Sequence, residues 1–448
     1  MSDRLFGTDG VRGVANIDLT PELALRLGRA AAFVLGDDSR GRFLIGRDTR
    51  QSGPMLEAAL TAAMCSAGSE VVRVGILPTP GMAYLTHVQG ATAGIVISAS
   101  HNPVEDNGIK FFASDGFKLP DAVEDRIAES LDRSDLPRPG GLEVGGVEDL
   151  PEAGAIYVDH LATIGSTPLG GLRVVVDCAW GAAYAVAPAL WRKLGATVIP
   201  IHDQPDGSRI NVASGSTHPM ALQQAVRDHG ADVGFAHDGD ADRVIAVDET
   251  GRILDGDVIM GVCALHLHAH GRLGSGRVIA TVMSNLGLEI ALRRARIVLE
   301  RTAVGDRYVL ERMRAVGATV GGEQSGHVIF LDHATTGDGL LTAIQVVNAM
   351  LETEKRLSEL AAPIETYPQI LRNVVVSDRG GFAGHAKIHE AIADVERALQ
   401  GRGRVLVRPS GTEPVVRIMV EAEDLDEATA LAGQLAGVIE QTLGGQSS

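Results

Sequence analysis

An apolar stretch ends in a polar turn that could present a nucleophile. Gly94–Ile97 is apolar, and the polar segment 98–103 follows it directly. Pro103 disfavours helix at the residue before it, so the chain should turn there. Because α/β folds bind ligands at the carboxyl ends of their strands, Ser100 is a candidate nucleophile. The alternative is an ordinary strand-to-turn junction in which serine and asparagine form the turn.

Three carboxylates, Asp238, Asp240 and Asp242, follow another apolar segment and are separated by small residues. Such a cluster needs a compensating cation, and its oxygen ligands favour a hard ion such as Mg²⁺. A calcium loop of the EF-hand type is rejected, because the sixth position is Arg243 rather than glycine and Val244–Val247 reads as a strand. An acidic turn without metal is the alternative.

A loop near the C-terminus combines arginines with small and hydroxylated residues. Hydroxyls, backbone N–H groups and a guanidinium together suit a phosphate. The loop lacks the Gly-Lys-Ser/Thr of a Walker loop, and an ordinary hairpin with solvated arginines is the alternative. The candidate residues are Arg408, Ser410, Gly411 and Thr412, with Arg417 in the following strand.

A glycine-rich segment, 321–327, carries polar groups between its glycines. Glu323, Ser325 and His327 could form hydrogen bonds with a polyhydroxylated ligand. A glycine-rich turn alone is weak evidence for such a site.

The elements that must position these residues follow a pattern that occurs three times. Each copy has an apolar strand, a loop, a helix and a second apolar strand, which indicates βαβ units and buried, largely parallel sheets. Three similar α/β domains in tandem are therefore predicted. The strand pairs are 42–46 with 71–74, 173–177 with 197–199, and 277–281 with 296–299.

The last 80 or so residues differ from this pattern and predict a smaller α+β domain. They contain an amphipathic helix near 388–399, strands at 404–407 and 416–420, and a final helix at 425–443. The tail 444–448 is expected to fray. The predicted domains are 1–152, 153–252, 253–365 and 366–448, together forming a central cleft.

Composition excludes several classes of protein. The net charge of −17 and the 4% aromatic content argue against a nucleic-acid partner. Three cysteines at no metal-ligand spacing indicate neither a disulfide framework nor a zinc site. No stretch resembles a membrane span or a signal peptide, so a cytoplasmic location is expected. The sequence is compatible with a homodimer and does not determine the oligomeric state.

Taken together, the four segments resemble motifs of the α-D-phosphohexomutase superfamily. The resemblance covers essentially the whole chain, with one motif in each predicted domain, and is closest to the bacterial phosphoglucosamine mutase family. Further matching segments are Phe6–Gly13, Asp106–Phe112, Gly215–Pro219 and Thr302–Arg307. Trp180 departs from the pattern, because a small polar residue is expected there.

The resemblance implies an isomerase that interconverts glucosamine 6-phosphate and glucosamine 1-phosphate for UDP-N-acetylglucosamine and peptidoglycan precursor synthesis. Phosphorylated Ser100 would transfer its phosphoryl group to the sugar, giving a 1,6-bisphosphate that turns around in the site. One Mg²⁺ would be held by Ser100, Asp238, Asp240 and Asp242. Glucosamine 1,6-bisphosphate or glucose 1,6-bisphosphate would act as activator.

The resemblance also implies roles for the remaining candidates. Arg243 and Arg12 would act in catalysis, and Lys110 and His327 would transfer protons, for which Lys110 needs a lowered pKa to act as a base. Glu323 and Ser325 would bind sugar hydroxyls. The loop from Arg408 to Thr412, with Arg417, would bind the phosphate that is not transferred. The C-terminal domain is expected to close over the cleft.

Three competing functions remain at this point. A phosphomannomutase or phosphoglucomutase would use the same machinery on another sugar. A phosphatase would release phosphate to water, which leaves a second phosphate loop unexplained. A non-catalytic sugar-phosphate sensor is disfavoured by the intact serine, aspartates and Lys110. Ser98 is the alternative nucleophile to Ser100.

Overall fold

The computed structural model describes residues 4–7, 9–36, 40–165, 168–377, 382, 384–410 and 414–447, without the side chains of 445–447. The chain divides into two compact units. The larger contains Met1–Met283 and Ile297–Ala362, and the smaller contains Ser284–Arg296 and Pro363–Ser448. No helix in the described ranges is both long and apolar enough to cross a membrane.

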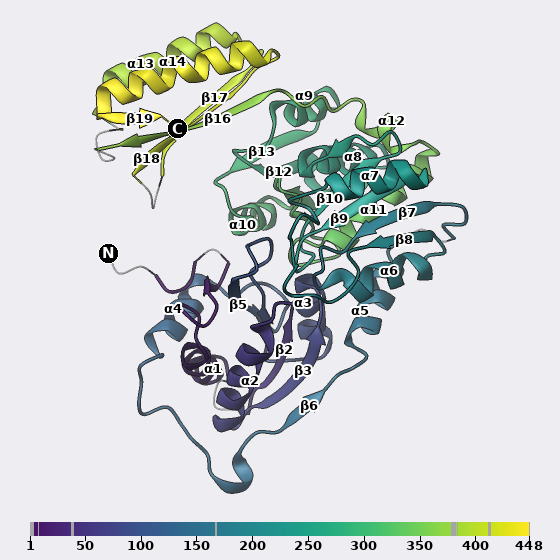
Figure 1. Cartoon of the computed structure of the whole chain (residues 1–448), viewed down its shortest axis with the longest axis vertical. Helices are drawn as coiled ribbons and strands as arrows, with labels where there is room; N and C mark the ends of the chain where they lie inside the picture. The colour runs from purple at the N-terminus through teal and green to yellow at the C-terminus, as the bar shows by residue number, and fades with distance from the viewer. Residues whose placement is uncertain are drawn as a thin grey trace. The chain divides into compact units, whose positions relative to one another are not determined.

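The first sheet of the larger unit has six strands in the order β1-β5-β4-β2-β3-β6 (Figure 1). Strand β2 pairs in parallel with β3 and β4, whereas β5 runs antiparallel to β1 and β4. Helix α1 packs against α2 and α4, while α3 packs against β4. The elements are β1 Val11–Val14, α1 Pro21–Leu35, β2 Arg42–Arg47, α2 Gly53–Ser66, β3 Glu70–Ile76, α3 Thr79–Val88, β4 Ala93–Ile97, β5 Asp106–Ala113, α4 Asp121–Glu129 and β6 Val147–Asp149.

The second sheet has the order β11-β10-β9-β7-β8. Strands β7, β8 and β9 are parallel, and the antiparallel β9–β10 pair places residues 238–243 in the tight connection between them. Helix α7 packs on β7 and β9, and α6 packs on β8. The elements are α5 Ala153–Ala162, β7 Arg173–Asp177, α6 Ala183–Lys193, β8 Thr197–Ile201, α7 Met220–His229, β9 Val233–His237, β10 Val244–Asp248 and β11 Ile253–Leu254.

The third sheet has the order β13-β12-β14-β15, with β12 parallel to β13 and β14. The predicted strand 296–299 is displaced: β13 begins at Val298, because Arg296 has a φ of 64° that ends extended structure there. The elements are α8 Gly256–Ala269, β12 Arg277–Thr281, β13 Val298–Thr302, α10 Asp306–Val316, β14 Val320–Gly322, β15 Val328–Phe330, α11 Gly339–Thr353 and α12 Leu357–Ala361.

The smaller unit contains an antiparallel sheet in the order β17-β18-β16-β19 with two helices packed on one face (Figure 1). The predicted fraying of the tail is wrong, since Gly445–Ser447 forms β19 and pairs with Val374–Val376. The elements are α9 Leu286–Arg294, β16 Gln369–Val376, α13 Ala386–Leu399, β17 Arg404–Pro409, β18 Val415–Glu421, α14 Leu425–Leu443 and β19.

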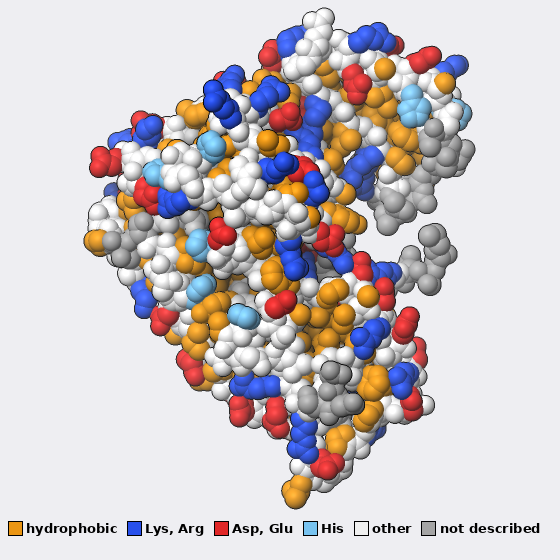
Figure 2. Space-filling view, turned by 180° about the vertical axis from the view of Figure 1, so that it is seen from behind, with side chains coloured by type: hydrophobic (Ala, Val, Ile, Leu, Met, Phe, Trp, Pro, Cys, Tyr) orange, Lys and Arg blue, Asp and Glu red, His pale blue; other side chains and the backbone are white. Residues whose placement is uncertain are grey.

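The predicted fold class is confirmed: three α/β domains with mixed, largely parallel sheets precede a smaller C-terminal α+β domain. On the face drawn in Figure 2, acidic and basic side chains are interspersed, as expected for a surface without a single-sign field.

Candidate active site

Ser100 lies in a tight turn immediately after β4 and is 1% exposed. Its φ of 53° is in the left-handed region, which costs a non-glycine residue roughly 1–2 kcal/mol. Its backbone N–H donates to Ser98 Oγ at 2.9 Å, and the Ser98 hydroxyl donates to Asp48 Oδ2 at 2.7 Å. Ser98 is thus engaged in holding the turn, while the Ser100 hydroxyl projects elsewhere.

Arg50 is the main support of this turn, and the sequence reasoning missed it. Its guanidinium is fully buried, pairs with Asp48 at 3.0 Å and donates to the carbonyls of Ser100 at 3.1 Å and Asn102 at 2.8 Å. The Asn211 side chain donates to the same Ser100 carbonyl at 2.8 Å. A sequence signal existed, because residues 48–50 follow β2, the parallel neighbour of β4, at its carboxyl end.

The three aspartates occupy the turn between β9 and β10, and one oxygen of each lies within 4.8 Å of the others. The Ser100 hydroxyl donates to Asp238 Oδ2 at 2.6 Å, so the structure brings the candidate nucleophile and the acidic cluster together. Gly239 permits this approach: a Cβ there would lie 2.6 Å from the Ser100 carbonyl oxygen, closer than a carbon side chain tolerates.

The buried aspartates influence one another's ionisation. Burial and the repulsion of Asp242 and Asp240 raise the pKa of Asp238 well above its usual value. Burial also opposes ionisation of Asp242, but the positive charges of His327 and Lys110 outweigh it and hold its pKa well below the usual range. The cluster therefore has one carboxyl that resists ionisation and one that ionises readily.

The donor set fits a divalent cation. Asp240 Oδ1 and Asp242 Oδ1 are buried and have no hydrogen-bond partner among the described residues. Buried polar atoms are normally satisfied, so the unpartnered carboxylate oxygens fit ligands of a cation. Three carboxylates and a nearby hydroxyl supply the oxygen ligands that Mg²⁺ prefers.

Lys110, on β5, contacts this cluster directly. Its ammonium lies 2.9 Å from Asp240 Oδ2 and 3.7 Å from Asp242 Oδ2. Burial would lower the pKa of Lys110, but attraction by Asp240 and Asp242 raises it above the ordinary value. This direction is opposite to the lowered pKa that a base at Lys110 requires.

The two predicted arginines lie at the edges of the cluster. Arg243 Nε is 3.8 Å from Asp242 Oδ1, and its backbone N–H donates to Asp238 Oδ1 at 3.2 Å. Arg12, on β1, donates to the Asn102 side chain at 3.3 Å and is 3.3 Å from Asp9. Arg12 therefore joins the serine turn to the N-terminal segment.

His327 is 3% exposed and lies between two carboxylates. Its Nδ1 is 3.7 Å from Asp242 Oδ2 and its Nε2 is 3.6 Å from Asp306 Oδ2, while the Gly337 N–H donates to Nε2 at 3.1 Å. Burial lowers the pKa of His327, but Asp242 and Asp306 raise it above the ordinary value. Lys118, also missed by sequence reasoning, pairs with Asp306.

The proposed sugar loop is half-buried beside these residues. Glu323 Oε1 accepts from the Gly305 N–H at 3.1 Å, and the Ser325 hydroxyl donates to Glu323 Oε2 at 3.4 Å. Ser325 itself is exposed. One face of the loop is thus fixed by β14 and β15 while a hydroxyl and a carboxylate remain accessible.

Trp180, the departure from the family pattern, lies beside the loop that carries Asn211. The Arg209 guanidinium stacks on the Trp180 ring, 3.8 Å from the ring centroid, and the backbone N–H of Trp180 donates to the His202 carbonyl at 3.0 Å. The Thr49 hydroxyl donates to the Trp180 carbonyl at 2.6 Å. Trp180 therefore packs against the segment that supports Ser100, and it does not touch the aspartates through any contact in the described part of the chain.

The arginine loop belongs to the smaller unit. Arg408 on β17 and Arg417 on β18 are cross-strand partners, and the Ser410 N–H donates to the Val415 carbonyl at 2.8 Å to close the hairpin. Gly411 and Thr412 lie outside the described residues. Like charges directly opposite each other on a sheet are destabilising, so this pairing suits an anion-binding surface.

Models of one family match four successive parts of the chain. They are described as phosphoglucomutase/phosphomannomutase alpha/beta/alpha domains I, II and III and the C-terminal domain. The matched residues are 3–138, 155–251, 255–367 and 371–438.

Similar proteins agree with these matches. A protein of Desulforudis audaxviator named phosphoglucosamine mutase is 55% identical over 438 residues, which are 97% of each chain. A solved phosphoglucomutase/phosphomannomutase family protein of Burkholderia thailandensis superposes with a TM-score of 0.81 at 23% identity, over 98% of both chains. Aspergillus fumigatus N-acetylphosphoglucosamine mutase, solved with GlcNAc-6P and magnesium, superposes with a TM-score of 0.66 at 18% identity over 98% of this chain and 96% of that one. The chain therefore belongs to the phosphoglucomutase/phosphomannomutase family of phosphohexomutases, which are isomerases.

Proposed function

We propose that this chain interconverts glucosamine 6-phosphate and glucosamine 1-phosphate through a phosphorylated Ser100 and a 1,6-bisphosphate intermediate. The observation that carries the proposal is the buried contact of the Ser100 hydroxyl with Asp238, 2.6 Å long, inside a cluster of three aspartates. The sugar is inferred from the 55% identical relatives named phosphoglucosamine mutase. A role in UDP-N-acetylglucosamine and peptidoglycan precursor synthesis is part of the same proposal.

In the proposed first half-reaction, the bond between phosphorus and Ser100 Oγ breaks as a sugar hydroxyl oxygen bonds to phosphorus. The hydroxyl loses its proton, and Ser100 Oγ regains one when the free serine forms. The second half-reaction is the reverse, with the other phosphate of the bisphosphate returned to Ser100. Magnesium bound by Ser100, Asp238, Asp240 and Asp242 would offset the negative charge around the transferring group.

Lys110 and His327 are the proposed proton-transfer groups, since both lie against the acidic cluster. The raised pKa of both side chains supports proton donation and charge stabilisation more directly than proton abstraction. Arg243 and Arg12 would stabilise the oxygens of the transferring phosphoryl group.

Glu323 and Ser325 are proposed to bind sugar hydroxyls, because they are the accessible polar groups of the 321–327 loop. Arg408, Ser410, Gly411, Thr412 and Arg417 are proposed to bind the phosphate that is not being transferred. Bidentate arginine contacts suit a phosphate that must be released and captured again at the opposite end of the sugar. Closure of the C-terminal domain during turnover remains a prediction.

The decisive experiment is a coupled assay of glucosamine 1-phosphate formation with and without glucose 1,6-bisphosphate. We expect formation to depend on both Mg²⁺ and the bisphosphate, because the bisphosphate phosphorylates Ser100. Glucosamine, glucose and mannose 6-phosphates are compared side by side, and glucosamine 6-phosphate should give the highest kcat/KM.

Two results would overturn the proposal. Stoichiometric release of inorganic phosphate would indicate a phosphatase. A higher kcat/KM for mannose or glucose 6-phosphate would assign the chain to another phosphohexomutase activity while leaving the serine chemistry intact.

A further inference from the structure

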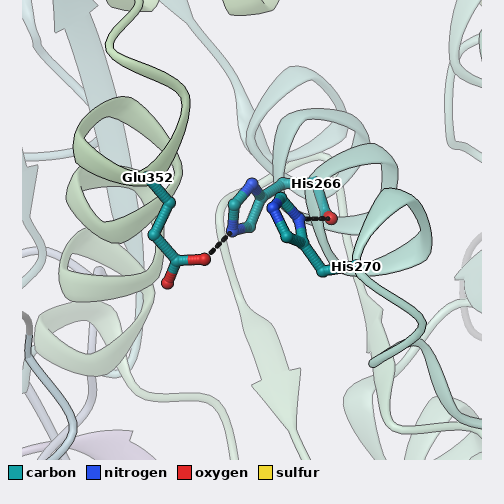
Figure 3. Close-up of side chains that lie close together, drawn as sticks. All are labelled: His266, His270 and Glu352. Carbon is teal, nitrogen blue, oxygen red and sulfur yellow. Dashed lines mark hydrogen bonds and ion pairs between the residues drawn. The ribbon is translucent and has the colours of Figure 1, made fainter.

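Two histidines and a glutamate meet where two helices of the larger unit end, apart from the residues proposed for catalysis. Helix α8 carries His266 in its last turn and His270 as its C-cap, and α11 carries Glu352 one residue before its end. One ligand atom of each residue lies within 4.8 Å of the others (Figure 3). A spacing of four residues places both histidines on one face of α8.

The hydrogen bond of the His270 imidazole leaves a lone pair on its Nε2. His270 Nδ1 lies 2.8 Å from the His266 carbonyl oxygen, which can only accept, so Nδ1 carries the proton. His266 Nε2 lies 2.9 Å from Arg272 Nη2, which can only donate, and 3.2 Å from Glu352 Oε2, which can only accept; the bond with Arg272 requires a lone pair on this nitrogen. A backbone carbonyl that fixes the tautomer of a histidine is a common support of metal-binding imidazoles.

The same place attracts positive charge. Glu352 Oε2 is 3.2 Å from His266 Nε2 and 2.5 Å from Arg272 Nη2. The carboxyl-terminal ends of α8 and α11 add partial negative charge. Arg272 already supplies a cation there, but its side chain is 47% exposed and can turn into solvent. The buried His266 and the exposed His270 leave the cluster open to solvent from one side.

We propose that His266, His270 and Glu352 form a binding site for one Zn²⁺ ion, which displaces Arg272 when it binds. Two imidazole nitrogens and one carboxylate match the ligand set of open, four-coordinate zinc sites, with water as the fourth ligand. Nitrogen donors separate this site from the all-oxygen aspartate cluster, which favours Mg²⁺. Bound zinc would tie α8 to α11 and would stabilise the fold rather than take part in phosphoryl transfer.

The test uses Co²⁺ as a spectroscopic stand-in for zinc, added to the full chain in excess Mg²⁺ so that the aspartate cluster is filled. We expect one equivalent of Co²⁺ to give the intense visible absorption of a tetrahedral site. H270Q should weaken binding at least about tenfold, since a ligand is lost. H268Q is the matched control, because His268 is an exposed histidine of the same helix outside the cluster, and it should bind as the wild type does.

A second variant tests the displacement of Arg272. R272Q removes the competing guanidinium and should bind Co²⁺ more tightly than the wild type, and Zn²⁺ should raise its Tm. Melting curves without metal establish that each variant is folded. The proposal is overturned if tetrahedral absorption is absent from both wild type and R272Q, or if H270Q binds as tightly as H268Q.

Discussion

In the larger unit, the charged groups around Ser100 are buried and each is held by several partners, whereas the arginines of the β17–β18 hairpin face each other across a sheet. Asp48, Arg50, Asp238 and Asp240 are fully buried. In the smaller unit Arg417 is exposed and Arg408 is half-buried. The first arrangement fixes positions at a cost in desolvation, and the second places two like charges opposite each other on neighbouring strands.

The difference indicates that the two regions have different roles in the proposed mutase: one transfers the phosphoryl group, and the other binds the second phosphate. Phosphoryl transfer needs a nucleophile and positive charge in fixed positions, because reorganisation during the reaction raises the barrier. A group that only binds the second phosphate must release it and bind it again after the intermediate turns. We therefore expect substitutions near Ser100 to lower kcat or stability, and substitutions in the hairpin to raise KM.

The largest effect is expected for S100A, which removes the proposed phosphate acceptor. The variant should lose at least about 10⁴-fold in kcat, because it lacks the oxygen proposed to carry the phosphoryl group. The measurement is the coupled assay together with mass spectrometry of the protein incubated with glucose 1,6-bisphosphate. S98A is the matched control, and it should still acquire one phosphoryl group. Phosphorylation of S100A at Ser98 would contradict the assignment.

Replacing Arg50 with methionine should give the next largest effect. The change leaves Asp48 buried without its cation and removes the donors to the Ser100 and Asn102 carbonyls. Breaking a buried ion pair from one side costs about 3–5 kcal/mol. Chemical denaturation measures the loss. R73Q removes an exposed pair with Asp149 and should change the free energy of unfolding by less than about 1 kcal/mol; equal effects of the two variants would contradict the supporting role.

The contact between Ser100 and Asp238 could not be predicted from local sequence patterns. The strand and helix patterns predicted three α/β sheets, because period and apolar continuity are local properties of the chain. Ser100 and Asp238 are 138 residues apart, and their contact follows from the packing of separate sheets. Only the joint resemblance of the motifs could predict it.

Residues that act through backbone carbonyls were not predicted. Arg50 and Asn211 donate to backbone carbonyls of the serine turn, so no motif spacing identifies them; only the position of Arg50 after β2 offered a signal. The raised pKa of Lys110 was missed for a related reason, since it depends on the distance to Asp240. The displaced β13 and the paired tail, by contrast, are local errors caused by a single left-handed residue and by a short polar strand.

The pH dependence of stability at Asp338 measures how much a buried charge destabilises the larger unit. Burial raises the pKa of Asp338 to about 6, although it accepts hydrogen bonds from Leu341 N–H and Tyr157 OH. The folded state binds this proton more tightly than the unfolded state. Its stabilising effect is therefore complete below about pH 4 and is lost as pH rises through about 6.

D338N should remove this dependence. From pH 4 to pH 8, the wild type should lose about 2 kcal/mol of unfolding free energy relative to D338N, because at pH 4 part of the effect set by a pKa of about 6 against the ordinary 3.8 is already lost. Other titrating groups are common to both proteins and cancel in the comparison. If the difference in unfolding free energy between the wild type and D338N stayed constant from pH 4 to pH 8, ionisation of Asp338 would not destabilise the fold, and the prediction would be wrong.

Substitution of a hairpin arginine should have the smallest effect on activity, and the effect should fall on KM rather than on kcat. R408Q should raise KM for glucosamine 6-phosphate about 10- to 100-fold with a much smaller change in kcat, because a hydrogen bond to a charged group contributes about 1.5–3 kcal/mol. Relief of the Arg408–Arg417 repulsion should leave the fold equally stable or slightly more so. R402Q, which changes an exposed arginine before β17 that pairs with Glu427, is the control and should leave KM unchanged. If kcat of R408Q fell by the same factor as its KM rose, Arg408 would act in the chemical step as the groups around Ser100 do. The proposed difference between the two regions would then be wrong.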